Sequence, residues 1–158
     1  MFNSNLSATV SLSRLAAMKR YLIWTSLLNF GWEVLQLPLY TIWVESSGRE
    51  IAFAVVHCTV GDAMITTISL VASVILVGKT EWPNRRYWVV ALTVILLGLG
   101  YTIYSEWNNT VVTRNWAYAA AMPQIWGIGL SPIAQWIIIP SFAFWRLYPP
   151  KASLNTRL

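Results

Sequence analysis

Two acidic side chains, Glu33 and Asp62, lie within otherwise apolar stretches of this sequence. An ionisable group is costly to place in an apolar helix, and it usually faces a partner, a substrate or a water-filled cavity. Two carboxyl groups held close together at low dielectric do not both ionise readily, so we expect one of them to keep a proton. A pair of this kind can supply the general acid and the general base of one reaction.

Other polar residues recur around the two acids at the spacing of a helix face. Residues at i, i+4, i+7 and i+11 lie on one side of an α-helix. Two segments repeat this spacing in full, with Asn29, Glu33, Gln36 and Tyr40 in one and Gln124, Ile128, Ser131 and Gln135 in the other. Two further segments carry polar faces made of Cys58, Asp62, Thr66, Ser69 and Ser73, and of Gly98, Thr102, Ser105 and Glu106. Four helices with one polar face each predict a polar core inside an apolar bundle.

The depth of each polar residue follows from its distance along the helix to a basic flank, at about 1.5 Å per residue. Glu33 lies roughly 20 Å from Arg20, and Asp62 lies about 25 Å from Lys79. The buried tier predicted in this way holds Glu33, Gln36, Asp62 and Ser131. A second tier, at roughly 30–33 Å, holds His57, Tyr40, Glu106 and Gln124. The two tiers predict one site that opens at the end of the bundle away from the basic flanks.

The candidate residues of this site fall into two groups. The candidate catalytic residues are Glu33, Asp62, His57 and Glu106. The candidate substrate-binding residues are Asn29, Gln36, Tyr40, Trp32, Ser131, Gln135 and Gln124. A purely structural role for the two acids is less favoured. An interhelical polar contact contributes about 0.6 kcal/mol, whereas an acid at a helix centre costs about 2.5–3.5 kcal/mol.

A metal site is an open alternative for the same side chains. It would need Glu33, His57, Asp62 and Glu106 to converge from three helices. Mixed oxygen and nitrogen ligands suit zinc, manganese or iron, but no paired motif such as Glu-x-x-His accompanies these residues. His57 has an equal alternative as an interfacial histidine bonded to water or to Glu106. The sequence therefore identifies neither a metal nor any other cofactor.

Four long apolar runs must position these residues. The chain has 158 residues, of which 56% are hydrophobic and only 11% are charged, whereas a soluble domain carries about 25% charged residues. The runs cover residues 21–44, 51–78, 87–105 and 125–145, and each is long enough to cross a bilayer as a helix. We expect one all-α domain, an antiparallel four-transmembrane-helix bundle, between a polar N-terminal tail at 1–13 and a C-terminal tail at 147–158.

The connections carry further predictions. The segment 107–124 is long and aromatic, which predicts an interfacial cap or half-helix between the third and fourth spans. Pro132 and Pro140 predict kinks in the fourth helix. The single Cys58 excludes an internal disulfide.

Lysine and arginine predict how the bundle is oriented. Nine basic residues flank one side of the four spans, namely Arg14, Lys19, Arg20, Lys79, Arg85, Arg86, Arg146, Lys151 and Arg157. The other side has only Arg49 and Arg114. The positive-inside rule then places both termini in the cytoplasm. The net charge of +5 fits basic loops that face an anionic leaflet, and no basic cluster is dense enough to predict nucleic-acid binding.

Four strings carry a resemblance to known proteins. They are LNFGWEVLQLPLY at residues 28–40, HCTVGD at 57–62, YSEWN at 104–108, and GIGLSP at 127–132 followed by Gln135 and Trp136. Together they resemble a group of small four-helix bacterial inner-membrane proteins, over about residues 20–145, and the resemblance implies no activity. Small membrane-embedded terpenoid cyclases also combine a few acids with aromatic walls, but without a matching motif they serve only as an analogy.

Three functions remain open at this point. The first is an intramembrane enzyme that uses acid–base chemistry on a lipid or isoprenoid-like substrate. The second is a non-catalytic accessory or assembly subunit of a membrane complex, and the third is a proton-coupled transport element. The expected location is a bacterial inner membrane, where the partners are membrane lipids and a lipid-like small molecule. Assembly into a homo-oligomer or a larger membrane complex is an open alternative.

Overall fold

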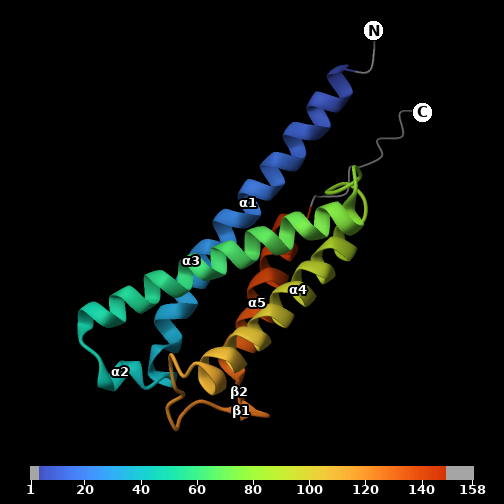
Figure 1. The fold of residues 1–158 in the computed structure, drawn as a ribbon. Helices are drawn as coiled ribbons and strands as arrows, with labels where there is room; N and C mark the ends of the chain where they lie inside the picture. The colour runs from blue at the N-terminus through green and yellow to red at the C-terminus, as the bar shows by residue number, and fades with distance from the viewer. Residues whose placement is uncertain (1–3, 149–158) are drawn as a thin grey trace.

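The computed structural model describes the backbone of residues 4–148 and the side chains of residues 14–148. The described chain is mostly helical, so the prediction of an all-α fold is confirmed. Its four long helices are α1 (Ser4–Gln36), α3 (Gly48–Ser73), α4 (Tyr87–Trp107) and α5 (Leu130–Leu147). Helix α1 packs on α3 and α5, and α4 packs on the same two helices from the other side (Figure 1).

The two ends of the bundle differ in charge. The start of α1, the link from α3 to α4 and the end of α5 gather at one end, while α2 (Ile42–Glu45) and a short hairpin lie at the other (Figure 1). The first end, which we call the basic end, carries Arg14, Lys19, Arg20, Lys79, Arg85, Arg86 and Arg146. Lys151 and Arg157, and with them most of the predicted C-terminal tail, lie outside the described residues. Helix α1 begins at Ser4, inside the segment predicted as a polar tail.

The first long helix is shorter at its far end than the apolar run predicted. Helix α1 ends at Gln36, and the short 3-10 helix η1 (Leu37–Leu39) and α2 follow it before α3. Pro38 lacks an amide hydrogen and clashes with a preceding helical turn, which explains why α1 stops there. Helix α3 begins after Ser47, whose hydroxyl accepts from the Glu50 amide while the Glu50 carboxylate accepts from the Ser47 amide.

The segment between α4 and α5 is not the predicted half-helix. Helix α4 continues as the π-helix η3 (Asn108–Val112), and the chain then runs extended along η1, where the Ala119 amide donates to the Leu39 carbonyl at 3.0 Å. Strands β1 (Gln124–Ile125) and β2 (Ile128–Gly129) form a small antiparallel hairpin. Trp126 and Gly127 turn the hairpin with φ values of 51° and 79°, a backbone that no helix contains, so α5 begins at Leu130 rather than at residue 125.

The two prolines of the fourth helix differ in position. Pro132 lies in the first turn of α5, where an amide hydrogen would have no partner within the helix, so the predicted kink at Pro132 is wrong. Pro140 is the proline inside this helix.

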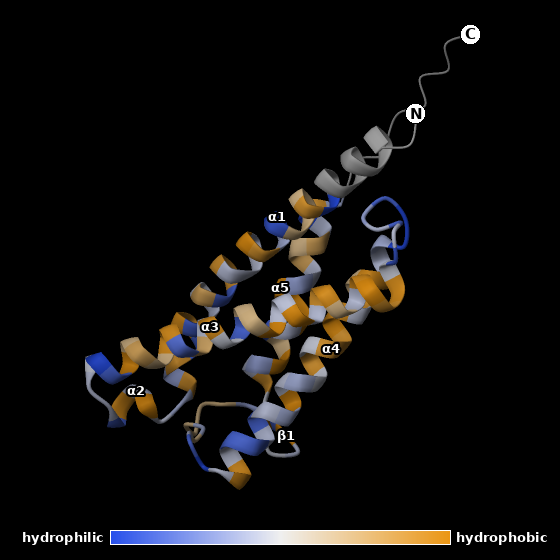
Figure 2. Cartoon of the chain, turned by 45° about the horizontal axis from the view of Figure 1, so that its top comes forward, coloured by the Kyte–Doolittle hydropathy of each residue, from blue (hydrophilic) through white to orange (hydrophobic). Residues whose placement is uncertain are grey.

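Two helical stretches are long and apolar enough to cross a membrane, Gly48–Gly78 and Tyr87–Val112. The first joins α3 to the π-helix η2 (Val74–Gly78), and the second joins α4 to η3. Only 33% and 28% of their most apolar windows are buried inside the bundle, whereas the core helix of a soluble protein hides most of its apolar surface. Apolar residues accordingly cover much of the outside of α3 and α4 (Figure 2). The polar faces of α1 and α5 lower the mean hydropathy of those two helices, so α1 and α5 are not among the stretches apolar enough to cross a membrane.

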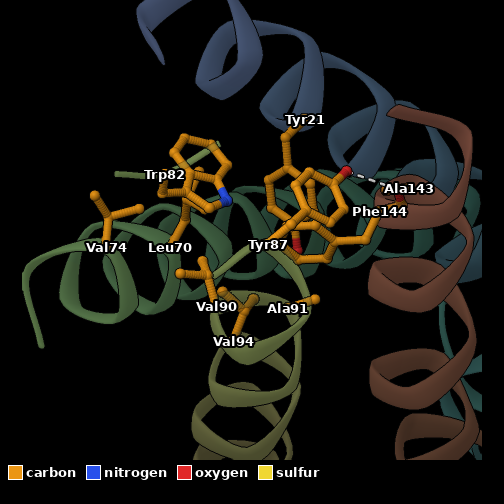
Figure 3. Packing of buried hydrophobic residues seen from close by; sticks show 10 residues of the cluster. All are labelled: Tyr21, Leu70, Val74, Trp82, Tyr87, Val90, Ala91, Val94, Ala143 and Phe144. Carbon is orange, nitrogen blue, oxygen red and sulfur yellow. Dashed lines mark hydrogen bonds between the residues drawn. The ribbon is translucent and has the colours of Figure 1, made fainter. Parts of the chain in front are cut away.

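An apolar core fills the basic end. Its members, drawn in Figure 3, are Tyr21, Leu70, Val74, Trp82, Tyr87, Val90, Ala91, Val94, Ala143 and Phe144. The Tyr87 hydroxyl donates to the Phe144 carbonyl at 2.7 Å, which ties α4 to α5. Arg14 donates to the carbonyls of Thr80 and Trp82, which ties the link between α3 and α4 to α1. The buried carboxyl and amide side chains lie in the other half of the bundle.

The close approach of α4 and α5 depends on Gly98. A Cβ added there would overlap the buried ring of Trp136, whereas a Cβ at Gly100 on the same helix would meet open space. We predict that Gly98→Ala lowers the free energy of unfolding by about 1–3 kcal/mol, the usual cost of overpacking, in a denaturation experiment in detergent. The matched variant Gly100→Ala should be at least as stable as the wild type, and equal stability of the two variants would contradict this packing.

Candidate functional site

The amide of Gln135 lies at the centre of the polar half of the bundle. Gln135 projects from α5 and is only 2% exposed. Its Nε2 lies 3.2 Å from Asn29 Oδ1, 3.1 Å from Glu33 Oε1 and 2.8 Å from Asp62 Oδ2. Asn29 and Glu33 belong to α1 and Asp62 to α3, so one amide group joins three helices. An amide nitrogen has only two hydrogens for these three acceptors.

Further hydrogen bonds extend from the Glu33 carboxyl group. Gln36 Nε2 donates to Glu33 Oε1 at 2.8 Å, and Ser131 Oγ donates to Gln36 Oε1 at 2.8 Å. Trp32 Nε1 in turn donates to Ser131 Oγ at 3.1 Å. Glu33 Oε1 and Asp62 Oδ2 accept from the same Gln135 Nε2, so these two carboxyl groups are neighbours. We call this set the buried polar cluster, and its members are Asn29, Glu33, Gln36, Asp62, Ser131 and Gln135.

A third carboxyl group, that of Glu106 on α4, is held by two tyrosines. The Tyr118 hydroxyl donates to Glu106 Oε2 at 2.5 Å, and the Tyr40 hydroxyl approaches the same oxygen at 3.5 Å. The Tyr118 oxygen accepts from the Gly129 amide at 2.9 Å. Burial and the hydrogen bond to Glu106 raise the pKa of Tyr118 above its ordinary range, so this hydroxyl remains a donor.

Both sets of side chains border one cavity of about 1080 Å³. From the buried polar cluster it reaches Glu33, Gln36, Asp62 and Gln135, and from the set around Glu106 it reaches Tyr40 and Glu106. His57 borders the cavity as well. Cavities of about 300–1,000 Å³ commonly hold small molecules, so this one is large enough for a ligand with a long chain. Asn115 and Trp116, in the extended segment after η3, also border it.

The wall between α3 and α4 is apolar and exposed. Phe53 and Ile68, which border the cavity from α3, are 71% and 64% exposed, and Tyr101 borders it from the exposed face of α4. These residues belong to the two stretches that are apolar enough to cross a membrane. The cavity therefore opens sideways, onto the apolar surface of the bundle.

Some predicted site residues lie apart from the cavity. Gln124 is exposed in β1 and does not border it. Trp32 and Asn29 do not border it either, although both bond to residues of the buried polar cluster. His57 is exposed and stacks on Phe53, with ring centroids 5.7 Å apart. Its partner is thus an aromatic ring rather than Glu106.

The proposed metal ligands are not gathered into one site. Within residues 14–148, no three His, Cys, Asp or Glu side chains form a group that could hold a metal ion. Glu33 and Asp62 approach each other, but Glu106 is held by Tyr118 and His57 by Phe53. The donor set does not fit the metal centre that the sequence left open.

Tyr118 is a site residue that the sequence pattern did not indicate. It lies in an extended segment, bridged to Tyr40 by backbone pairing, and helical periodicity says nothing about such a segment. Cys58 was included in a polar face but not in the site, and it borders the cavity. Cys58 lies one helical turn before Asp62, and this spacing was the sequence signal that could have placed it in the site.

The central position of Gln135 leads to a stability prediction. Leucine in place of Gln135 keeps much of the volume but leaves buried oxygens on α1 and α3 without their donor. We expect Gln135→Leu to lower the free energy of unfolding by about 1–3 kcal/mol, measured by denaturation in detergent. Gln124→Leu, at the exposed glutamine, is the matched control and should change stability little. A Gln135→Leu protein as stable as this control would show that the amide does not hold the bundle together.

No protein-family model, curated protein or solved structure matches this chain. Its function therefore has to be inferred from the chemistry of its own side chains.

Proposed function

We propose that this chain is an integral membrane protein of four spans, with its basic end and both termini in the cytoplasm of a bacterial cell. The two apolar stretches with outward-facing side chains support a membrane location. Helices α1 and α5 pack beside them and have polar faces that point inward, as expected of spans that share a polar core. The basic residues at one end support the orientation.

Cysteine labelling tests this orientation. Cys58 is the single cysteine, so Cys58→Ala provides a background without thiols. Into this background we would introduce Gly48→Cys, at the end that holds α2, or Thr80→Cys, at the basic end. We expect a membrane-impermeant maleimide to label the first variant in intact cells and the second only after lysis. The opposite pattern, or labelling of both in intact cells, would exclude this topology.

We further propose that the protein is an enzyme that performs acid–base chemistry on a lipid-like substrate with a carbon–carbon double bond. The observation that carries this proposal is the position of Glu33 and Asp62. Their carboxyl groups share the Gln135 amide nitrogen as a donor, and both residues border a large cavity that opens through apolar side chains. A lipid-like molecule can reach such a cavity from the bilayer without crossing water.

One proton shared by the two carboxyl groups is sufficient for the reaction. The protonated carboxyl donates its proton to one carbon of the double bond, and a carbocation forms at the other carbon. The second carboxylate then removes a proton from a neighbouring carbon, and a double bond forms again at a new position or in a ring. The pair ends with one proton, as it began. The rings of Tyr40 and Trp136, which border the cavity, would stabilise the cation.

Deuterium labelling tests this chemistry without a known substrate. The full-length protein would be embedded in lipid nanodiscs made from a lipid extract of the source organism and incubated in deuterium oxide. We expect the wild type to place non-exchangeable deuterium on carbon in a lipid species, as detected by mass spectrometry. Glu33→Gln and Asp62→Asn should reduce this labelling by about 10²-fold or more, while Glu45→Gln, at an exposed glutamate of α2, should retain it. Equal labelling in all four proteins, or none in the wild type, would refute the proposal.

An accessory role has one observation in its favour, because the buried polar cluster joins three helices and could serve only to hold the bundle. The stability of the same variants separates the two functions. If the two carboxyl groups are catalytic, they are kept at a cost in stability, and Glu33→Gln and Asp62→Asn should raise the free energy of unfolding. If the carboxyl groups are structural, the same substitutions should lower it. Transport receives less support, because an apolar core fills the basic end of the bundle.

A further inference from the structure

The ionisable side chains that border the cavity are mostly acidic. Its wall carries the carboxyl groups of Glu33, Glu50, Asp62 and Glu106, together with the imidazole of His57. Within the described residues, no lysine or arginine borders it. Proteins that bind phosphate or carboxylate groups surround them with arginine, lysine or backbone amides. The head of a lipid with a negative charge would therefore meet only like charge in this cavity.

A free hydroxyl group gives a second observation that points to a ligand. Thr102 borders the cavity from α4, one helical turn from Glu106, and is only 6% exposed. Its Oγ1 is buried and has no hydrogen-bond partner in the described part of the chain. Other helical threonines behave differently, since Thr59 and Thr93 donate to the carbonyls of Val55 and Val89 four residues earlier. A buried polar atom without a partner is rare and calls for one.

The cavity also has a distinct apolar part. Along α3 it extends from Glu50 past Asp62 to Ile68 and Ala72, and on α4 it extends from Asn109 to Leu97. The carboxyl groups lie toward the end that holds α2, whereas the part toward the basic end is mostly aliphatic, with Ser69 as a polar member. This division matches a molecule with one polar head and a hydrocarbon chain.

We infer that the cavity binds an amphiphile whose head donates hydrogen bonds and has no negative charge, such as a long-chain alcohol or amine, and that it rejects a phosphate head. This inference rests on the proposed function and narrows its substrate class. The head lies beside Asp62 and Glu106, whose carboxyl oxygens accept its hydrogen bonds, and the buried Thr102 hydroxyl turns toward the head and gains its missing partner. The chain lies along Ile68 and Leu97. An isoprenoid substrate of this enzyme is thus an alcohol or an amine, not a diphosphate.

The inference can be tested with three probes that differ only in the head. Radiolabelled farnesol, farnesylamine and farnesyl phosphate would be bound to the purified full-length protein in phosphatidylcholine nanodiscs, with partition into empty nanodiscs subtracted. We expect farnesol and farnesylamine to bind, and farnesyl phosphate to bind at least about tenfold more weakly. Thr102→Val should weaken farnesol binding several-fold, whereas Thr93→Val, at a threonine with a backbone partner, should leave it unchanged.

Gly61 and Gly100 provide a control for the location of the bound probe. A Cβ at either glycine would meet nothing within 4 Å, but only Gly61 borders the cavity. Gly61→Phe should therefore fold and fill the cavity, which abolishes binding of every probe, while Gly100→Phe should bind as the wild type does.

Two outcomes would overturn the inference in different ways. If farnesyl phosphate binds as tightly as farnesol, and Gly61→Phe abolishes that binding, the inferred preference for an uncharged or basic head is refuted. The proposed enzyme function would still stand. Binding that Gly61→Phe does not affect, or that is absent for all three probes, would refute both the inference and the lipid-binding role of the cavity.

Discussion

The hydrogen bonds of the Gln135 amide are the constraint on which the polar half of the bundle depends. This one side chain reaches from α5 to Asn29 and Glu33 on α1 and to Asp62 on α3. A buried carboxyl group without a donor is costly, and the cost is greatest where water and lipid supply none. The relative rotation of three helices is therefore fixed by the need to bring their polar faces to one amide. The same need places Glu33 and Asp62 next to each other.

The two halves of the bundle divide the work of folding and of binding. Tight packing of aromatic and aliphatic side chains around Tyr87 and Phe144 fills the basic end. The other half contains a large cavity and gives up much of the dispersion energy that close packing provides. Hydrogen bonds between polar faces replace part of that stabilisation. A site with access from one side follows, because the packed half closes the bundle at its basic end.

The buried polar cluster could be predicted because its residues obey helical periodicity. The spacing of Asn29, Glu33 and Gln36 fixes one face of α1 whatever surrounds it. The ends of the helices were harder to place, because Pro38 and the turn at Gly127 interrupt runs that are apolar throughout. Periodicity also could not reveal Tyr118, because its contact with Glu106 depends on how an extended segment folds back over η1.

That extended segment determines the direction from which a ligand can enter. Its backbone pairs with Leu39 of η1 and with Thr41, which follows η1, and Tyr118 donates to Glu106. Asn115 and Trp116 of the same segment form part of the cavity wall near the end that holds α2. The wall between α3 and α4 has no such cover and consists of exposed apolar side chains such as Phe53 and Ile68. Entry through that wall suits a molecule already dissolved in the bilayer, because its chain remains in an apolar environment while its head moves toward the carboxyl groups.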